Sequence, residues 1–140
     1  DYDQAGAVPY RERDGELEFC LITTTSKKKW CFPKGIIDPG ETPAETALKE
    51  ASEEAGLIGE ICGEPLGDYQ YRKWGRSLNV LMMLMRVSES ADSWDEADVR
   101  DRQWVDVETA SRLLDPDTLQ PFVDAAASRL GIVITVETKL

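Results

Sequence analysis

Histidine is absent from this chain of 140 residues, and that absence excludes several kinds of catalytic site. A Ser-His-Asp triad, a zinc protease site of the H-E-x-x-H type and an iron site with two histidines and one carboxylate all require histidine. Any catalysis must therefore use carboxylates, lysine, tyrosine, cysteine, a metal ion or a cofactor.

Cysteine is scarce, with Cys20, Cys31 and Cys62 as the only examples. The number is odd and no pair has C-x-x-C spacing, so the sequence indicates neither a disulfide framework nor a zinc site. The lack of a disulfide framework leads us to expect a reducing, cytoplasmic location. We also expect the thiols to be buried, because free cysteine is among the residue types most often buried.

Long apolar runs are also missing. The longest, near residues 80–85 and 132–136, are too short to cross a bilayer. The first residues do not show the basic and then apolar pattern of a signal peptide. We therefore expect no membrane partner.

Basic side chains are outnumbered, 16 to 27, which gives a net charge of −11. This balance argues against a general nucleic-acid binder, because that function needs a basic surface. The excess is concentrated in residues 35–64, which hold one basic and eight acidic side chains. Hydrophobic residues make up 41% of the chain, so we expect one globular domain over residues 1–140.

Hydrophobic periodicity and turn residues predict an alternation of strands and helices. Such alternation is typical of an α/β domain with a mixed sheet. The predicted strands cover residues 4–10, 17–24, 30–32, 67–72, 78–87 and 103–106, the predicted helices cover 43–55, 109–114 and 117–130, and a strand-like tail covers 132–136.

The helix at residues 43–55 has clear signals at both ends. Thr42 is a good N-cap, Pro43 fits the first helical position, and Glu45 completes a T-x-x-E capping box. Gly56 fits the position that follows the last helical residue.

Three glutamates, Glu50, Glu53 and Glu54, lie at i, i+3 and i+4 spacing on one side of this helix. Like charges at that spacing destabilise a helix, and anions near its C-terminus oppose the helix dipole. A divalent cation would turn this repulsion into binding, because Mg²⁺ prefers oxygen ligands. The alternative is a solvated acidic face.

The glutamates belong to a longer pattern that begins at Gly35. Glu41, Glu50, Glu53, Glu54, Gly56 and Leu57 follow it at fixed spacing. The segment closely resembles the Nudix box, G-x5-E-x7-R-E-U-x-E-E-x-G-U, in which U is a bulky apolar residue. Two positions depart from the pattern, since Lys49 replaces arginine and Ala51 replaces the apolar residue.

The resemblance implies an α/β/α sandwich with a central mixed sheet, a loop-helix-loop motif and hydrolysis of phosphoanhydride bonds. Glu50, Glu53 and Glu54 would bind Mg²⁺ or Mn²⁺, with the Gly35 carbonyl as a further ligand. Glu41 would orient the site by pairing with Lys49. The general base would be one of the box glutamates or a carboxylate outside it, such as those of the acidic loop: Glu89, Asp92, Asp95 and Glu96.

The residues before the box, from Trp30 to Gly35, are similar to the W-x-x-P-x-G entrance of diphosphoinositol polyphosphate and diadenosine polyphosphate hydrolases. We therefore expect a small polyphosphate substrate of one of these classes and a monomer or homodimer. The alternatives are a housekeeping nucleotide hydrolase or a non-catalytic sensor of nucleotides or inositol phosphates. Basic side chains expected to hold phosphates are Arg11, Lys27, Lys28, Lys29, Lys34, Arg72, Arg76, Arg100 and Arg102.

Aromatic residues allow two interpretations. Tyr69 and Tyr71 are expected to pack within a strand, with stacking on a nucleobase as the alternative. The four tryptophans, Trp30, Trp74, Trp94 and Trp104, are expected to be packing residues.

Overall fold

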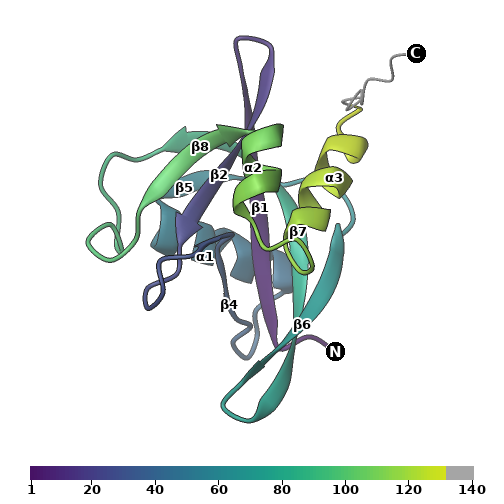
Figure 1. Cartoon of the computed structure of the whole chain (residues 1–140). Coiled ribbons are helices and arrows are strands. Elements are labelled where there is room, and N and C mark those ends of the chain that lie inside the picture. Colours follow the sequence, from purple (N-terminus) through teal and green to yellow (C-terminus); the bar gives the residue numbers. More distant parts are fainter. Residues whose placement is uncertain (132–140) are drawn as a thin grey trace.

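The computed structural model describes residues 1–131 and shows a strongly bent mixed sheet with three helices (Figure 1). The prediction of one domain over residues 1–140 stays a prediction, and the expected strand-like tail at 132–136 lies outside the described residues. The elements are β1 (Gln4–Arg13), β2 (Glu16–Thr23), β3 (Trp30–Cys31), β4 (Lys34–Ile36), α1 (Pro43–Ala55), β5 (Leu57–Ile61), β6 (Gly67–Lys73), β7 (Arg76–Ser90), β8 (Arg102–Asp106), α2 (Val107–Leu113) and α3 (Gln120–Arg129).

Two long strands, β1 and β7, pair in parallel at the centre of the sheet, with Gln4 opposite Val80 and Tyr10 opposite Arg86. Every other pairing is antiparallel. Along β1, the N-terminal part pairs with β4 and the C-terminal part with β2. Strand β7 likewise pairs with β6 near its start and β5 near its end. The sheet is therefore mixed, as predicted.

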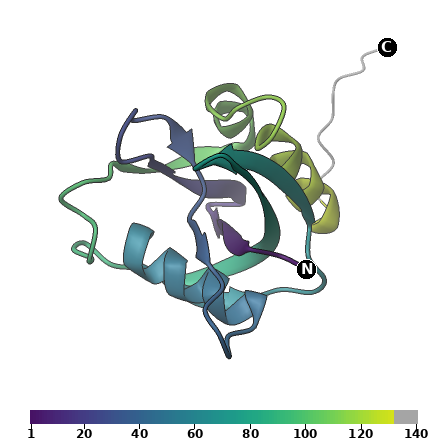
Figure 2. The same cartoon turned by 90° about the horizontal axis from the view of Figure 1, so that it is seen from below.

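The helices cover opposite faces of the sheet, which gives three layers (Figure 2). On one face, the small residues Ala47, Ala51 and Ala55 of α1 pack against a cluster that includes Ala7 and Met85. On the other face, α2 and α3 bury a larger apolar cluster that includes Phe19, Leu84, Phe122 and Val123. This arrangement confirms the α/β/α sandwich.

The helix α1 has the predicted bounds, Pro43–Ala55. The Thr42 side chain accepts a hydrogen bond from the Glu45 backbone at 3.1 Å, and the Glu45 carboxylate accepts one from the Thr42 backbone at 2.9 Å. Gly56 ends the helix in the left-handed conformation, with φ of 69°. The capping signals in the sequence therefore form as expected.

Some elements differ from the sequence prediction. Strands β4 and β5 were not expected, because each is short and pairs with a distant part of the chain. Helix α2 begins at Val107, since the Asp106 carboxylate caps it through the Thr109 backbone N–H at 2.8 Å. Helix α3 begins only at Gln120, because Pro121 fits the first turn of a helix and not its interior.

No helix within residues 1–131 combines the length and the apolar composition that a membrane span requires.

Candidate active site

Two glutamates of α1, the buried Glu54 and the half-buried Glu50, form an acidic pair under β4. Glu54 is 8% exposed, and its Oε1 accepts a hydrogen bond from the Lys34 backbone N–H at 3.2 Å. The Glu50 carboxylate lies directly against Gly35, so that a Cβ atom at position 35 would overlap it. A glycine at this position therefore makes room for the carboxylate.

The acidic pair keeps a proton more readily than ordinary glutamates do. Burial raises the pKa of Glu54 to about 8, against the attraction of Arg100 and with a further rise from Glu50. Burial also raises the pKa of Glu50 above its ordinary value, and a hydrogen bond with Glu54 offsets only part of this rise. Neighbouring carboxylates repel each other when both are ionised, and a cation added to the pair would relieve this repulsion.

This donor set fits a divalent cation by its chemistry. Mg²⁺ and Mn²⁺ bind carboxylate oxygens, and such binding displaces the proton that a crowded carboxyl pair retains. Within residues 1–131, no three acidic side chains are already arranged to hold a metal ion. Glu53 lines the same groove as Glu50 and Glu54, so the predicted ligands share one surface.

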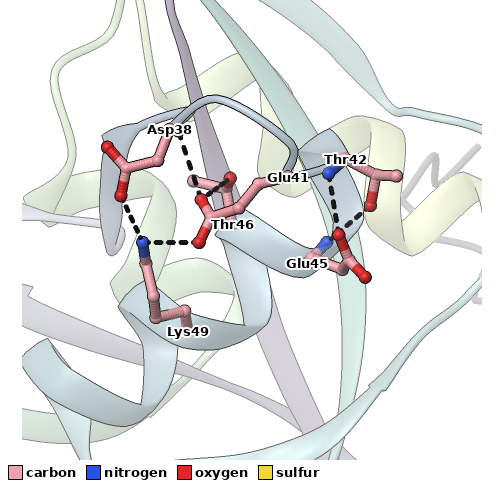
Figure 3. A network of polar contacts seen from close by, with 6 residues as sticks. All are labelled: Asp38, Glu41, Thr42, Glu45, Thr46 and Lys49. Atoms are coloured by element: carbon pink, nitrogen blue, oxygen red, sulfur yellow. Dashed lines mark hydrogen bonds and ion pairs between the residues drawn. The ribbon is translucent and has the colours of Figure 1, made fainter.

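Glu41, in the loop before α1, forms the predicted ion pair with Lys49 of the helix (Figure 3). Lys49 Nζ lies 2.8 Å from Glu41 Oε2 and 3.0 Å from Asp38 Oδ2. Glu41 Oε1 also accepts a hydrogen bond from the Thr46 hydroxyl at 2.8 Å. The pKa of Glu41 falls below its ordinary value because of the hydrogen bonds from Lys49 and Thr46. Lysine thus anchors the loop before α1 without the planar fork of arginine.

The other end of α1 is held by the segment 91–102, which overlaps the acidic loop expected from the sequence at residues 88–101. The backbone carbonyls of the last three residues of α1 and of Gly56 each accept a hydrogen bond from this segment. The donors are the Glu96 N–H to Glu53 at 3.1 Å, the Trp94 indole to Glu54 at 2.9 Å, the Arg102 guanidinium to Ala55 at 2.8 Å and the Ala91 N–H to Gly56 at 2.9 Å.

Four cationic side chains meet the acidic residues in a groove of about 550 Å³, which we call the catalytic groove. Lys34 and Arg100 were predicted from sequence to hold phosphates and Lys49 to pair with Glu41, whereas Lys73 was not among the expected site residues. Arg100 Nη2 lies 3.4 Å from Glu54 Oε2, and its Nε lies 2.7 Å from Glu96 Oε1. Lys27 lines an adjoining hollow that also contains Lys34 and Arg100.

The remaining predicted cations have other contacts. Arg11 lies 4.0 Å from the ring centre of Trp104 and pairs with Glu18. Arg102 lies 4.1 Å from the ring centre of Trp94. Lys28 and Arg72 donate hydrogen bonds to backbone carbonyls, those of Val99 and Gly75 respectively. Arg76 pairs with Asp3, and Lys29 lines a different cleft together with Trp30.

The aromatic residues divide between core and groove. Tyr69 packs on Phe122 with ring centres 5.9 Å apart, and burial raises its pKa. Tyr71 donates a hydrogen bond to Gln4 at 2.9 Å, and the Lys34 ammonium lies 4.7 Å from its ring centre. The expectation that Trp74 packs is wrong, because its side chain is 75% exposed at the β6–β7 turn.

Cys20 and Cys31 do not offer an alternative nucleophile. Burial raises the pKa of Cys20 to about 12 and that of Cys31 to about 11. A thiol with so high a pKa is almost fully protonated at neutral pH and therefore unreactive.

The chain belongs to the Nudix family, since the model of the NUDIX domain matches residues 3–126. Nudix hydrolase 4 of Arabidopsis thaliana is 34% identical over 125 residues, which cover 78% of this chain and 60% of that protein. The asymmetrical bis(5'-nucleosyl)-tetraphosphatase of Caenorhabditis elegans is 30% identical over 118 residues, which cover 79% of this chain and 83% of that protein.

A solved structure shares the fold over nearly the whole chain. The crystal structure of the C. elegans Ap4A hydrolase superimposes with a TM-score of 0.77 at 25% identity, and the match covers 92% of this chain and 98% of that one. The branch of the family expected from the sequence, which includes the diadenosine polyphosphate hydrolases, fits these relatives.

Proposed function

We propose that the chain hydrolyses a phosphoanhydride bond of a dinucleoside polyphosphate and uses Mg²⁺ or Mn²⁺ as its cofactor. The observation that carries this proposal is the meeting of three glutamates and four cationic side chains in the catalytic groove. The similarity to a bis(5'-nucleosyl)-tetraphosphatase favours a dinucleoside over an inositol substrate.

The acidic and the basic side chains of the groove have separate roles. Glu50, Glu53, Glu54 and the Gly35 carbonyl would hold the cation. When bound, a divalent cation neutralises charge on the phosphate oxygens and activates the attacking water. The side chains of Lys34 and Lys73 bind and orient the polyphosphate, because ammonium groups attract phosphate oxygens from several directions.

A carboxylate must also accept the proton of the attacking water. Glu53 and the loop residue Glu96 lie beside the buried pair, since the Glu96 backbone N–H donates to the Glu53 carbonyl. One of the helix carboxylates, or Glu96, serves as this base, and hydrolysis yields two phosphorylated products. Arg100 fixes Glu96 and Glu54 relative to each other through its two ion pairs.

The test is a hydrolysis assay with Mg²⁺ or Mn²⁺ on diadenosine tetraphosphate, a diphosphoinositol polyphosphate and nucleoside triphosphates. The wild-type chain is compared with the double variant Glu53→Gln, Glu54→Gln. Glu45→Gln is the matched control, because it makes the same change on α1 and preserves the capping box. We expect the double variant to lose hydrolysis and the control to keep it.

Other outcomes identify the alternatives. A preference for the diphosphoinositol substrate or for mononucleotides would move the assignment to that substrate class. Binding that depends on metal but without turnover would identify a sensor. Equal slow rates for wild type and double variant on every substrate would overturn the catalytic proposal.

A further inference from the structure

The catalytic groove lies between two other hollows and shares residues with both. A cleft of about 750 Å³, with Trp30 and Tyr69 in its wall, shares Lys34 and Tyr71 with the groove. A smaller hollow of about 290 Å³ shares Gln4, Ile36 and Trp74 with the groove. The three spaces therefore form a continuous surface in which the acidic residues occupy the middle.

Trp74 is the most exposed large apolar side chain of the smaller hollow. It is 75% exposed at the tip of the β6–β7 hairpin and has φ of 55°, in the left-handed region. Gly75 follows with φ of 73°, and such two-residue turns normally place asparagine or aspartate before the glycine. Tryptophan at this position contributes little to the core and adopts a backbone conformation that bulky residues avoid. Folding therefore does not explain it.

The hairpin tip is held in place by neighbouring contacts. The Arg72 guanidinium donates to the Gly75 carbonyl at 2.8 Å, and Arg76 pairs with Asp3 at 3.4 Å. The Asp3 carboxylate also accepts a hydrogen bond from the Asn79 backbone at 2.8 Å. These contacts fix the turn on the sheet, so the indole is presented at a defined place.

The chemistry of the smaller hollow suits a flat aromatic group. Ile36, which is 54% exposed, lines the same hollow as Trp74 and provides a second apolar surface. The Lys73 ammonium lies 4.5 Å from the ring centre of the indole and also lines the catalytic groove, where phosphates would enter.

We propose that Trp74 and Ile36 form a binding site for the second nucleobase of a dinucleoside polyphosphate whose phosphates lie across the catalytic groove. This inference rests on the proposed function and narrows its substrate to molecules with an aromatic group at each end. Trp74 stacks on the base, as exposed aromatic side chains commonly do with nucleobases. Lys73 attracts the adjacent phosphate.

The kinetic test compares a substrate with two bases and one with a single base. Wild type, Trp74→Ala and Trp74→Phe are assayed on diadenosine tetraphosphate and on adenosine 5'-tetraphosphate. We expect Trp74→Ala to raise KM for the two-base substrate by about tenfold, given the strength of base stacking, and to change KM for the one-base substrate by less than about twofold. Trp74→Phe restores most of the affinity because it keeps an aromatic face.

Ile58→Ala is the matched control, because Ile58 is also 54% exposed but lies on β5. It should leave both KM values unchanged. Equal changes in KM for the two substrates in Trp74→Ala, or no change for either, would overturn the proposed base site.

A binding measurement separates this inference from the proposed function. A diadenosine tetraphosphate analogue with methylene bridges, which resists hydrolysis, is titrated into wild type and Trp74→Ala by calorimetry in the presence of Mg²⁺. We expect about tenfold weaker binding to the variant. If wild type hydrolyses no substrate but this difference persists, the proposed function fails and the base site stands. If hydrolysis occurs and the difference is absent, only the base site fails.

Discussion

The two ends of α1 are held by different kinds of contact. At the N-terminal end, Thr42 and Glu45 cap each other, and Lys49 reaches back to Glu41 and Asp38. All of these partners lie within 11 residues of one another. At the C-terminal end, the Glu54 and Ala55 carbonyls bind side chains that are 40 and 47 residues further along the chain.

The difference matters because the glutamates proposed to bind the metal ion, Glu50, Glu53 and Glu54, lie in the second half of the helix. The local contacts can form as soon as the helix does, whereas the long-range contacts require the sheet and the segment 91–102 to be assembled. The last four carbonyls of a helix lack partners within it, and here the carbonyls of the last three residues of α1 and of Gly56 each have a donor from that segment. The position of the carboxylates therefore depends on tertiary structure.

The largest effect in this comparison is expected for Arg102→Met. The variant loses a charged donor to the Ala55 carbonyl and the stacking of the guanidinium on Trp94. We expect the free energy of unfolding to fall by about 2 kcal/mol, as for other hydrogen bonds from charged groups. Affinity for Mg²⁺ should also fall, because the last turn of α1 becomes less ordered.

Urea unfolding and calorimetric titration with Mg²⁺ measure the two effects of Arg102→Met. Arg13→Met, at an exposed residue beside the β1–β2 turn, controls for the loss of one positive charge. A stability of Arg102→Met equal to that of the control would show that the long-range contacts do not hold the helix.

A smaller effect is expected at the local end. Thr42→Ala removes the N-cap oxygen, and such changes typically cost about 1 kcal/mol of stability. Mg²⁺ affinity should stay near the wild-type value, because Glu50, Glu53 and Glu54 lie in the C-terminal half of the helix, away from Thr42. The same unfolding and titration experiments test this, with Thr42→Ser as the control that keeps the cap. A loss of Mg²⁺ affinity as large as that of Arg102→Met would remove the distinction between the two ends.

The sequence predicted the features of α1 that depend on local contacts and missed those that depend on distant ones. Thr42, Pro43, Glu45 and Gly56 are local signals, and they gave both ends of α1 correctly. The spacing of Glu50, Glu53 and Glu54 placed them on one side of a helix, and the structure places all three at one groove. These features depend on residues close in sequence, where helix geometry alone fixes the relative positions.

Features that depend on distant pairing could not be predicted in this way. Arg100 and Arg102 are two residues apart, and both were predicted to hold phosphates. Arg100 pairs with Glu54, however, and Arg102 stacks on Trp94. Only the path of the loop against α1 decides between these positions. The burial that raises the pKa of Glu54 is likewise a result of packing under β4, an element too short to show a pattern.

The ion pair of Lys49 should have a smaller effect on stability than the cap. Lys49→Met removes the contacts with Glu41 and Asp38, but these groups are partly solvent-exposed, and exposed ion pairs contribute little to stability. We expect a decrease in the thermal midpoint smaller than that of Thr42→Ala. Lys49→Arg should match wild type, because arginine keeps the charge. A midpoint of Lys49→Met below that of Thr42→Ala would show that the ion pair, and not the cap, is the main local contact.

The smallest effect concerns a local cap away from the groove, at the start of α2. The Asp106 carboxylate accepts a hydrogen bond from the Thr109 backbone at 2.8 Å, and this bond lowers the pKa of Asp106. A carboxyl group with a lowered pKa stabilises the folded state above its unfolded pKa of about 4, and that stabilisation is lost as the pH falls through the lower folded value. Asp106→Asn keeps a cap that does not titrate. The difference in urea midpoint between wild type and Asp106→Asn should therefore be constant from pH 7 to 5 and move against wild type below about pH 4, where protonation weakens its cap. A difference that stays constant down to pH 3 would mean that the Asp106 carboxylate does not stabilise α2 through its charge.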